Sequence, residues 1–159
     1  MMTVLENHEL IAKISSHGAE ALSLYDKTTK TEYIWQGDKT YWSWHAPICF
    51  PITGRVHNDE YIFENKKYAL TVHGFARDYE FKVSSQDDTS IEFLFESNEE
   101  TLKIYPFNFK LYLKYILNGK KLRMEYRVEN LGDKKMYFSL GAHPAFATPG
   151  GENIDYSDD

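Results

Sequence analysis

Two histidines stand directly after short apolar stretches, each next to a glycine or a proline. His73 lies in Val72-His-Gly-Phe-Ala-Arg-Asp78, and His143 lies in Ser139-Leu-Gly-Ala-His-Pro-Ala-Phe146. Imidazole titrates near neutral pH, so two imidazoles on rigid strand ends could act as a neutral hydrogen-bond donor and a general acid. Each histidine taken alone also fits a purely structural role.

One arginine is placed by a stiff segment of the chain. Arg55 ends the sequence His45-Ala-Pro-Ile-Cys-Phe-Pro-Ile-Thr-Gly-Arg55, in which two prolines and a glycine interrupt an apolar run. A guanidinium donates several hydrogen bonds in a fixed geometry and keeps its charge, so Arg55 is a candidate clamp for a substrate. An ion pair with a surface carboxylate is an equally supported alternative.

Other kinds of active site are not indicated by the sequence. The histidines His8, His17, His45 and His57 have no partner at metal-ligand spacing, and we interpret them as incidental. Cys49 is the single cysteine, which excludes an internal disulfide and a cysteine zinc cluster. Glycine-rich phosphate loops, serine elbows and HExxH motifs are absent from the sequence. We therefore expect neither a metal nor a cofactor.

Length and charge narrow the class of partner. The 159 residues carry 18 Lys and Arg against 24 Asp and Glu, a formal net charge of -6. This balance argues against a nucleic-acid partner, which would need a basic stripe. No apolar run approaches the roughly 20 residues that span a bilayer, and no secretory leader is recognisable, so we expect no membrane partner and a cytoplasmic location. The length suits one domain over residues 1–159.

The second half of the sequence alternates apolar and polar residues with a period of two. This pattern predicts a strand beginning at Ser90, then a hairpin of strands 109–117 and 122–128 around Asn118-Gly119. A tight Asn-Gly loop would place lysines of the first strand opposite arginines of the second. A four-residue loop from Asn118 to Lys121 instead places Lys114 opposite Glu125, so we favour that register.

Shorter strands are predicted along the first half of the chain, with turn residues between them and no helical stripe anywhere. They are Leu10–Ile14, Ala21–Tyr25, Tyr33–Trp35, Tyr61–Phe63, Tyr68–Val72 and Tyr79–Val83. Many short strands indicate an all-β, antiparallel sandwich or barrel. The aromatic content of 16% suits the core of such a fold, and it also suits stacking against sugar rings.

Several of these segments together resemble the aldose 1-epimerase (galactose mutarotase) family, and within it the LacX-like branch. The likeness rests on five motifs in a matching order: His17-Gly-Ala-Glu20, Trp35-Gln-Gly-Asp38, Phe50-Pro-Ile-Thr-Gly-Arg55, His73-Gly-Phe-Ala-Arg-Asp78 and Leu140-Gly-Ala-His-Pro-Ala-Phe146. The resemblance implies a β-supersandwich and an isomerase that interconverts the α and β anomers of a free sugar without a cofactor. It implies that His143 is the acid at the ring oxygen, that His73 is the second histidine near C1, and that Arg55 binds substrate.

The family's catalytic glutamate and a sugar-binding aspartate lie in a second half that has no counterpart in these 159 residues. None of Glu152, Asp155, Asp158 and Asp159 can be assigned to either role. The sequence therefore resembles an N-terminal half, a sandwich incomplete at its C-terminal end. We expect self-association or a missing C-terminal partner, because uncovered sheet edges invite pairing. The alternatives to an active isomerase are a non-catalytic carbohydrate-binding domain and an inactive fragment, and the sugar is expected to be a hexose or a hexose phosphate.

Overall fold

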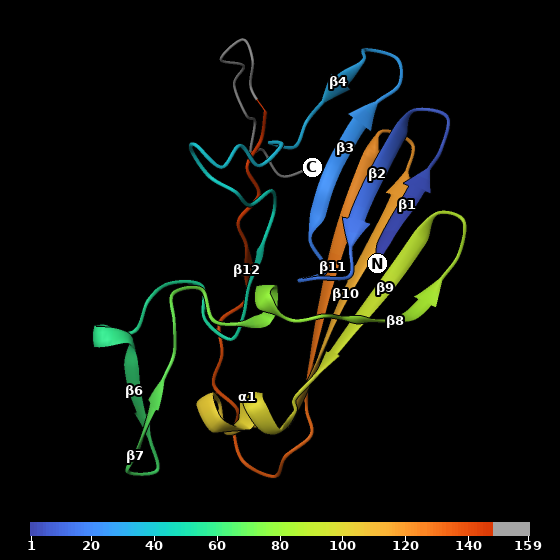
Figure 1. Ribbon diagram of the computed structural model, residues 1–159. Coiled ribbons are helices and arrows are strands. Elements are labelled where there is room, and N and C mark those ends of the chain that lie inside the picture. The colour runs from blue at the N-terminus through green and yellow to red at the C-terminus, as the bar shows by residue number, and fades with distance from the viewer. Residues whose placement is uncertain (148–159) are drawn as a thin grey trace.

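The computed structural model describes residues 1–147 of the chain and consists mainly of two antiparallel four-stranded sheets. In Figure 1 the first sheet lies over the second. The first sheet has the order β1-β2-β3-β4, with β1 at Met2–Glu6, β2 at Leu10–Ser15, β3 at Ala21–Asp26 and β4 at Thr31–Glu32. The second has the order β11-β10-β9-β8, with β8 at Lys82–Gln86, β9 at Ser90–Glu96, β10 at Phe109–Asn118 and β11 at Lys121–Asn130. The predicted all-β antiparallel sandwich is confirmed.

The hydrophobic core fills the space between the two sheets. Alternate residues of longer strands such as β2, β9 and β10 point inward. Ile14 of the first sheet and Phe93 of the second are both 0% exposed and belong to one cluster. The buried hydroxyl of Tyr115 on β10 donates a hydrogen bond of 2.6 Å to the carbonyl of Ala19, just before β3. This bond ties the second sheet to the turn that precedes β3.

The β10–β11 hairpin has the register that charge complementarity predicted. Lys114 lies opposite Glu125, and Asn118 pairs with Lys121 to close the turn. Gly119 occupies the turn with a φ of +54°, a left-handed value that glycine adopts without strain.

Short elements complete the fold on one side of the sandwich (Figure 1). They are β5 at Ile48–Cys49, β6 at Glu60–Phe63, β7 at Lys66–Ala69, β12 at Gly141–Ala142, the helix α1 at Glu99–Ile104 and the 3₁₀ turns His57–Asp59 and Ala76–Asp78. β6 and β7 form a separate hairpin, whereas β5 and β12 pair with each other. Within residues 1–147, no helix has the length and apolar character that crossing a bilayer requires.

Three of the predicted strands need correction. The predicted strand 33–35 is wrong: β4 covers only Thr31–Glu32, and Ile34 makes a single bridge to Phe146. The strand predicted at 79–83 begins later, at Lys82, because the turn Ala76–Asp78 ends immediately before Tyr79. The strand predicted at 68–72 ends at Ala69, because the chain turns again at residues 72–73.

The helix α1 and the strand β1 were not predicted from the sequence. α1 has six residues, which is too short to show a helical stripe. Its start is fixed by a capping box, in which the Asn98 side chain accepts from the backbone of Glu100 and Thr101 and the Thr101 hydroxyl accepts from the Asn98 backbone. The acidic residues Glu99 and Glu100 in the first turn and Lys103 in the last turn are further local signs of the helix.

Candidate functional site

The two histidines singled out in the sequence meet in the structure. The ring centroids of His73 and His143 lie 5.5 Å apart, with an interplanar angle of 64°. The segments that carry His73 and His143 both pair with the same stretch of chain, β5 and the residue that follows it. β12 pairs with β5, and Phe50 forms a parallel bridge to Gly74 on the other side. One short stretch of chain therefore positions both histidines.

The backbone of His73 is held in a left-handed conformation. Its φ is +65°, which is uncommon for a residue with a side chain. Its N–H donates to the carbonyl of Gly54 at 2.8 Å, and its carbonyl accepts from the N–H of Phe50 at 3.1 Å. These two bonds fix the strained turn between neighbouring segments, as is typical of functional sites.

The imidazole of His73 has a defined tautomer. Its Nδ1 lies 2.6 Å from the carbonyl oxygen of Thr53. A carbonyl oxygen can only accept a hydrogen bond, so Nδ1 carries a proton. The other ring nitrogen, Nε2, is then the atom available to a ligand, as an acceptor in the neutral ring and as a donor in the protonated ring.

His143 is solvent-exposed and lies against an aromatic ring. The centroids of the Trp42 ring and the His143 ring are 5.1 Å apart. The backbone N–H of His143 donates to the carbonyl of Pro47 at 2.9 Å. The indole N–H of Trp35 donates to the carbonyl of Trp42 at 2.8 Å and so helps to fix the position of Trp42.

Arg55 follows Gly54 directly, and the alternative expected for it, an ion pair with a surface carboxylate, is present in the structure. Its Nε donates to Asp59 Oδ1 at 2.7 Å, and 65% of its side chain is exposed. The ion pair occupies one of the five guanidinium N–H groups. The four N–H groups on the terminal nitrogens are not part of that contact, so the pair orients the guanidinium and leaves donors for a ligand.

His17, His57 and Cys49 make contacts other than those between His73 and His143. His17 forms an ion-pair contact of 3.4 Å with Glu80, and His57 begins a 3₁₀ turn. Cys49 is buried on β5, and this burial raises the pKa of its thiol, which disfavours the nucleophilic thiolate. Among residues 1–147, no cluster of three or more His, Cys, Asp or Glu could hold a metal ion. Glu152, Asp155, Asp158 and Asp159 lie outside the described residues.

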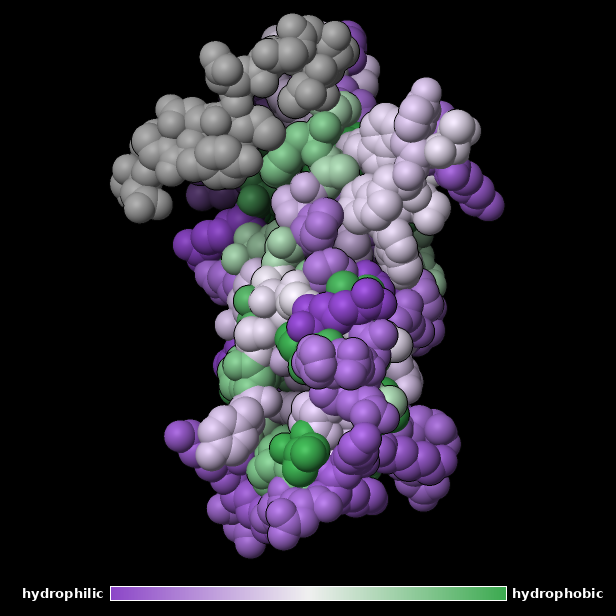
Figure 2. Space-filling model, turned by 90° about the vertical axis from the view of Figure 1, so that its left-hand side faces the viewer, coloured by the Kyte–Doolittle hydropathy of each residue, from purple (hydrophilic) through white to green (hydrophobic). Residues whose placement is uncertain are grey.

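An apolar groove of about 490 Å³ adjoins the segment that carries Thr53. Its walls include Ile52, Tyr61 and Phe138, and its lining continues to Ser139, whose N–H donates to the carbonyl of Pro51. Figure 2 views the side of the molecule that carries β6 and β7, and apolar patches interrupt the polar surface there. The groove thus lies close to the histidine-bearing segments.

The sequence did not indicate the role of the Thr53 carbonyl. It belongs to the Pro-Ile-Thr-Gly-Arg segment that drew attention to Arg55, but a backbone acceptor leaves no mark on residue type. The contact between Trp42 and His143 was equally hidden, because no strand pattern covers that loop.

Comparisons with known proteins give a consistent answer. The sequence model of the aldose 1-epimerase family matches residues 1–158. The plasmid-encoded protein LacX of Lactococcus lactis subsp. lactis is 38% identical over 164 residues, which are 99% of this chain and 54% of LacX. The chain therefore spans about half the length of the curated relatives it matches.

Solved structures agree with the sequence comparisons. A galactose mutarotase related enzyme from Lactobacillus acidophilus has a TM-score of 0.93 and 42% identity, over 96% of this chain and 52% of that protein. A galactose mutarotase-like protein from Lactobacillus casei has a TM-score of 0.89 and 44% identity, over 92% of this chain and 50% of that protein.

Proposed function

The chain belongs to the aldose 1-epimerase family, and from this premise we propose that it acts in the interconversion of the α and β anomers of a hexose. The observation that carries the proposal is the approach of His73 and His143 to a ring separation of 5.5 Å. Two imidazoles at that separation can contact neighbouring oxygens of one sugar ring.

The chemistry opens and recloses the sugar ring. A base removes the proton of the C1 hydroxyl, the C1–O5 bond breaks, and an acid gives a proton to the ring oxygen. Rotation about C1–C2 and reclosure then yield the other anomer. We assign the acid role at the ring oxygen to His143. No residue of this chain is assigned the role of the base.

We assign His73 to the oxygen at C1. Because its Nδ1 proton is directed to the Thr53 carbonyl, Nε2 is the nitrogen that meets the substrate. A neutral His73 would only accept at Nε2, unlike the neutral donor expected from the sequence, so the donor in this proposal is the protonated ring. It donates a hydrogen bond to the negative charge that develops at the C1 oxygen, and a preorganised donor of this kind lowers the barrier.

Arg55 is assigned to substrate binding through its terminal N–H groups. The resemblance of the segment Phe50 to Arg55 to the family motif supports this role, and the ion pair with Asp59 leaves four of the five guanidinium N–H groups for a ligand. The sugar is a hexose or a hexose phosphate. Galactose is the first sugar to test, because the two similar solved structures are a galactose mutarotase related enzyme and a galactose mutarotase-like protein. With a net charge of -6, any preference for a phosphate would be local to Arg55.

The test is the rate of anomer exchange, measured by polarimetry on freshly dissolved α-galactose, α-glucose and glucose 6-phosphate. We expect acceleration by the 159-residue protein and a loss of about 10²–10⁴-fold of that acceleration in His143→Ala. His8→Ala, an exposed histidine outside the site, is the control and should match the parent. Sugar binding without acceleration would instead favour a non-catalytic carbohydrate-binding domain, and neither binding nor acceleration would favour an inactive fragment.

A further inference from the structure

Glu20 is a buried carboxylate immediately before β3, the third strand of the first sheet. It ends the His17-Gly-Ala-Glu20 motif just before β3, and only 6% of it is exposed. Its Oε1 accepts two backbone hydrogen bonds, from the N–H of His45 at 2.8 Å and from the N–H of Ala46 at 2.9 Å. A buried carboxylate makes strong hydrogen bonds of this kind because water does not compete for them.

The same peptide group that contacts Glu20 also holds the segment of His143. The carbonyl of His45 and the N–H of Ala46 belong to one peptide unit. While that N–H donates to Glu20, the carbonyl accepts from the N–H of Ala145 at 2.9 Å. One further acceptor on this loop, the carbonyl of Pro47, receives the N–H of His143 at 2.9 Å.

The loop that Glu20 fixes also carries the aromatic neighbour of His143. Trp42 precedes His45 by three residues, and its ring centroid lies 5.1 Å from that of His143. The loop bound by Glu20 is therefore joined to the His143 segment by two backbone hydrogen bonds, from His143 and Ala145, and by the ring contact of Trp42.

We propose that Glu20 is a positioning residue for His143. By fixing the 42–47 loop, its carboxylate sets the place of the imidazole relative to Trp42 and His73 without touching a substrate. That this placement matters for catalysis rests on the proposed function, whereas the placement itself can be measured without any sugar. A displacement of about 1 Å at a reacting group can cost about 10²-fold in rate.

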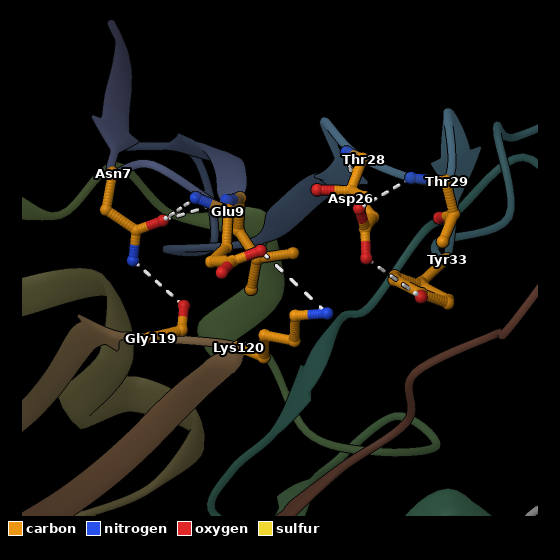
Figure 3. Close-up of polar contacts among 9 residues, drawn as sticks. Asn7, Glu9, Asp26, Thr28, Thr29, Tyr33, Gly119 and Lys120 are labelled. Atoms are coloured by element: carbon orange, nitrogen blue, oxygen red, sulfur yellow. Dashed lines mark hydrogen bonds and ion pairs between the residues drawn. The ribbon is translucent and has the colours of Figure 1, made fainter.

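The other end of β3 supplies a matched control. Asp26 is 4% exposed, and its Oδ1 accepts the backbone N–H groups of Thr28 and Thr29 at 2.7 and 2.9 Å. Figure 3 shows this carboxylate within its turn, beside Tyr33. Asp26 and Glu20 thus share burial and bonding but differ in what the bound loop carries.

The experiment compares histidine ring signals by NMR in the 159-residue protein. The His143 signal is identified by its loss in His143→Ala, and its shift reports the nearby Trp42 ring. We expect Glu20→Ala to move this signal toward the value of a free histidine. Glu20→Gln, which keeps an acceptor oxygen in place, should restore it. Glu20→Ala and Asp26→Ala should both lower the melting temperature, but Asp26→Ala should leave the His143 signal in place.

Two results would overturn the proposal: an unmoved His143 signal in Glu20→Ala, or an equal movement in Asp26→Ala. If Glu20→Ala does not fold, Glu20→Asp replaces it, since a carboxylate one methylene shorter withdraws from both N–H groups and should move the same signal. Where the parent accelerates anomer exchange, Glu20→Ala should lose about 10²-fold and Glu20→Gln should recover most of it. A parent without activity would contradict the proposed function and leave the NMR comparison intact.

Discussion

Gly74 packs so tightly on Phe50 that a Cβ atom at position 74 would stand 2.2 Å from the Phe50 carbonyl oxygen. The same oxygen accepts the N–H groups of Phe75 and Ala76 at 3.0 and 3.2 Å. Phe50 in turn donates its own N–H to the carbonyl of His73. The glycine after His73 is therefore what lets the histidine turn lie directly against the chain that follows β5.

Gly74→Ala should destabilise the protein more than Gly119→Ala. Both glycines have a positive φ, +72° and +54°, so both substitutions carry the left-handed cost of about 1–2 kcal/mol. Position 119 has no atom within 4 Å of an added Cβ, whereas position 74 meets backbone. We expect about 1–3 kcal/mol more loss at position 74 from overpacking. Urea unfolding of both variants measures the difference, and equal losses would contradict the close approach.

His73 and His143 should act as a unit. Because their rings are 5.5 Å apart and are assigned to one sugar, each single alanine variant should remove most of the acceleration. The double variant should then lose far less than the product of the two single losses. Polarimetry on galactose with all four proteins gives the cycle, and strictly multiplicative losses would show that the histidines work independently.

Arg55→Lys should weaken substrate binding more than it slows the chemistry. Lysine keeps the charge but loses the fixed guanidinium fork, so one or two charged hydrogen bonds are lost, or about 10–100-fold in KM. The value of kcat should change little if Arg55 binds ground state and transition state alike. Arg123→Lys is the matched control, since Arg123 is also exposed (67%) and ion-paired, with Glu125 on β11. A fall in kcat with an unchanged KM would argue against the binding role.

Much of the fold could be read from the sequence, because antiparallel strands with one buried face alternate in polarity. The β10–β11 register followed from placing Lys114 opposite Glu125. His143 directly follows the strand β12, as expected, whereas His73 lies in a turn four residues beyond the end of β7. The meeting of the two histidines depends on β5, a strand of two residues that is too short to show a period. Glu20 accepts a hydrogen bond from the backbone N–H of His45, and the backbone carbonyl of Thr53 accepts one from His73. Contacts with backbone atoms cannot be recognised from residue types.

The Asp87 carboxylate should make a contribution to the stability of the folded protein that is lost in acid. Hydrogen bonds from the Thr89 backbone, the Ser90 hydroxyl and the Ser90 backbone lower its pKa to about 2 in the folded protein. A lowered pKa means that the unfolded chain takes up the proton first, so this contribution is present above about pH 4 and is lost as the pH falls toward 2. The difference in urea midpoint between the parent and Asp87→Asn should be largest near neutral pH and shrink across that interval. A constant difference would show that the carboxylate charge contributes nothing.

The 159-residue chain should associate with itself, because β11 ends the second sheet with an incompletely covered inner face. Within the described residues β11 pairs only with β10, and Leu122, Met124, Tyr126 and Val128 on its inner face are only partly buried. Light scattering should give a mass at least twice that of one chain, falling on dilution. Met124→Lys places a charge on the inner face and should reduce the association, as edge charges do. Glu125→Gln, on the opposite face of the same strand, should leave the association unchanged. A monomeric mass together with a cooperative melt would contradict this expectation, because it would mean that the partly buried face of β11 is stable in water.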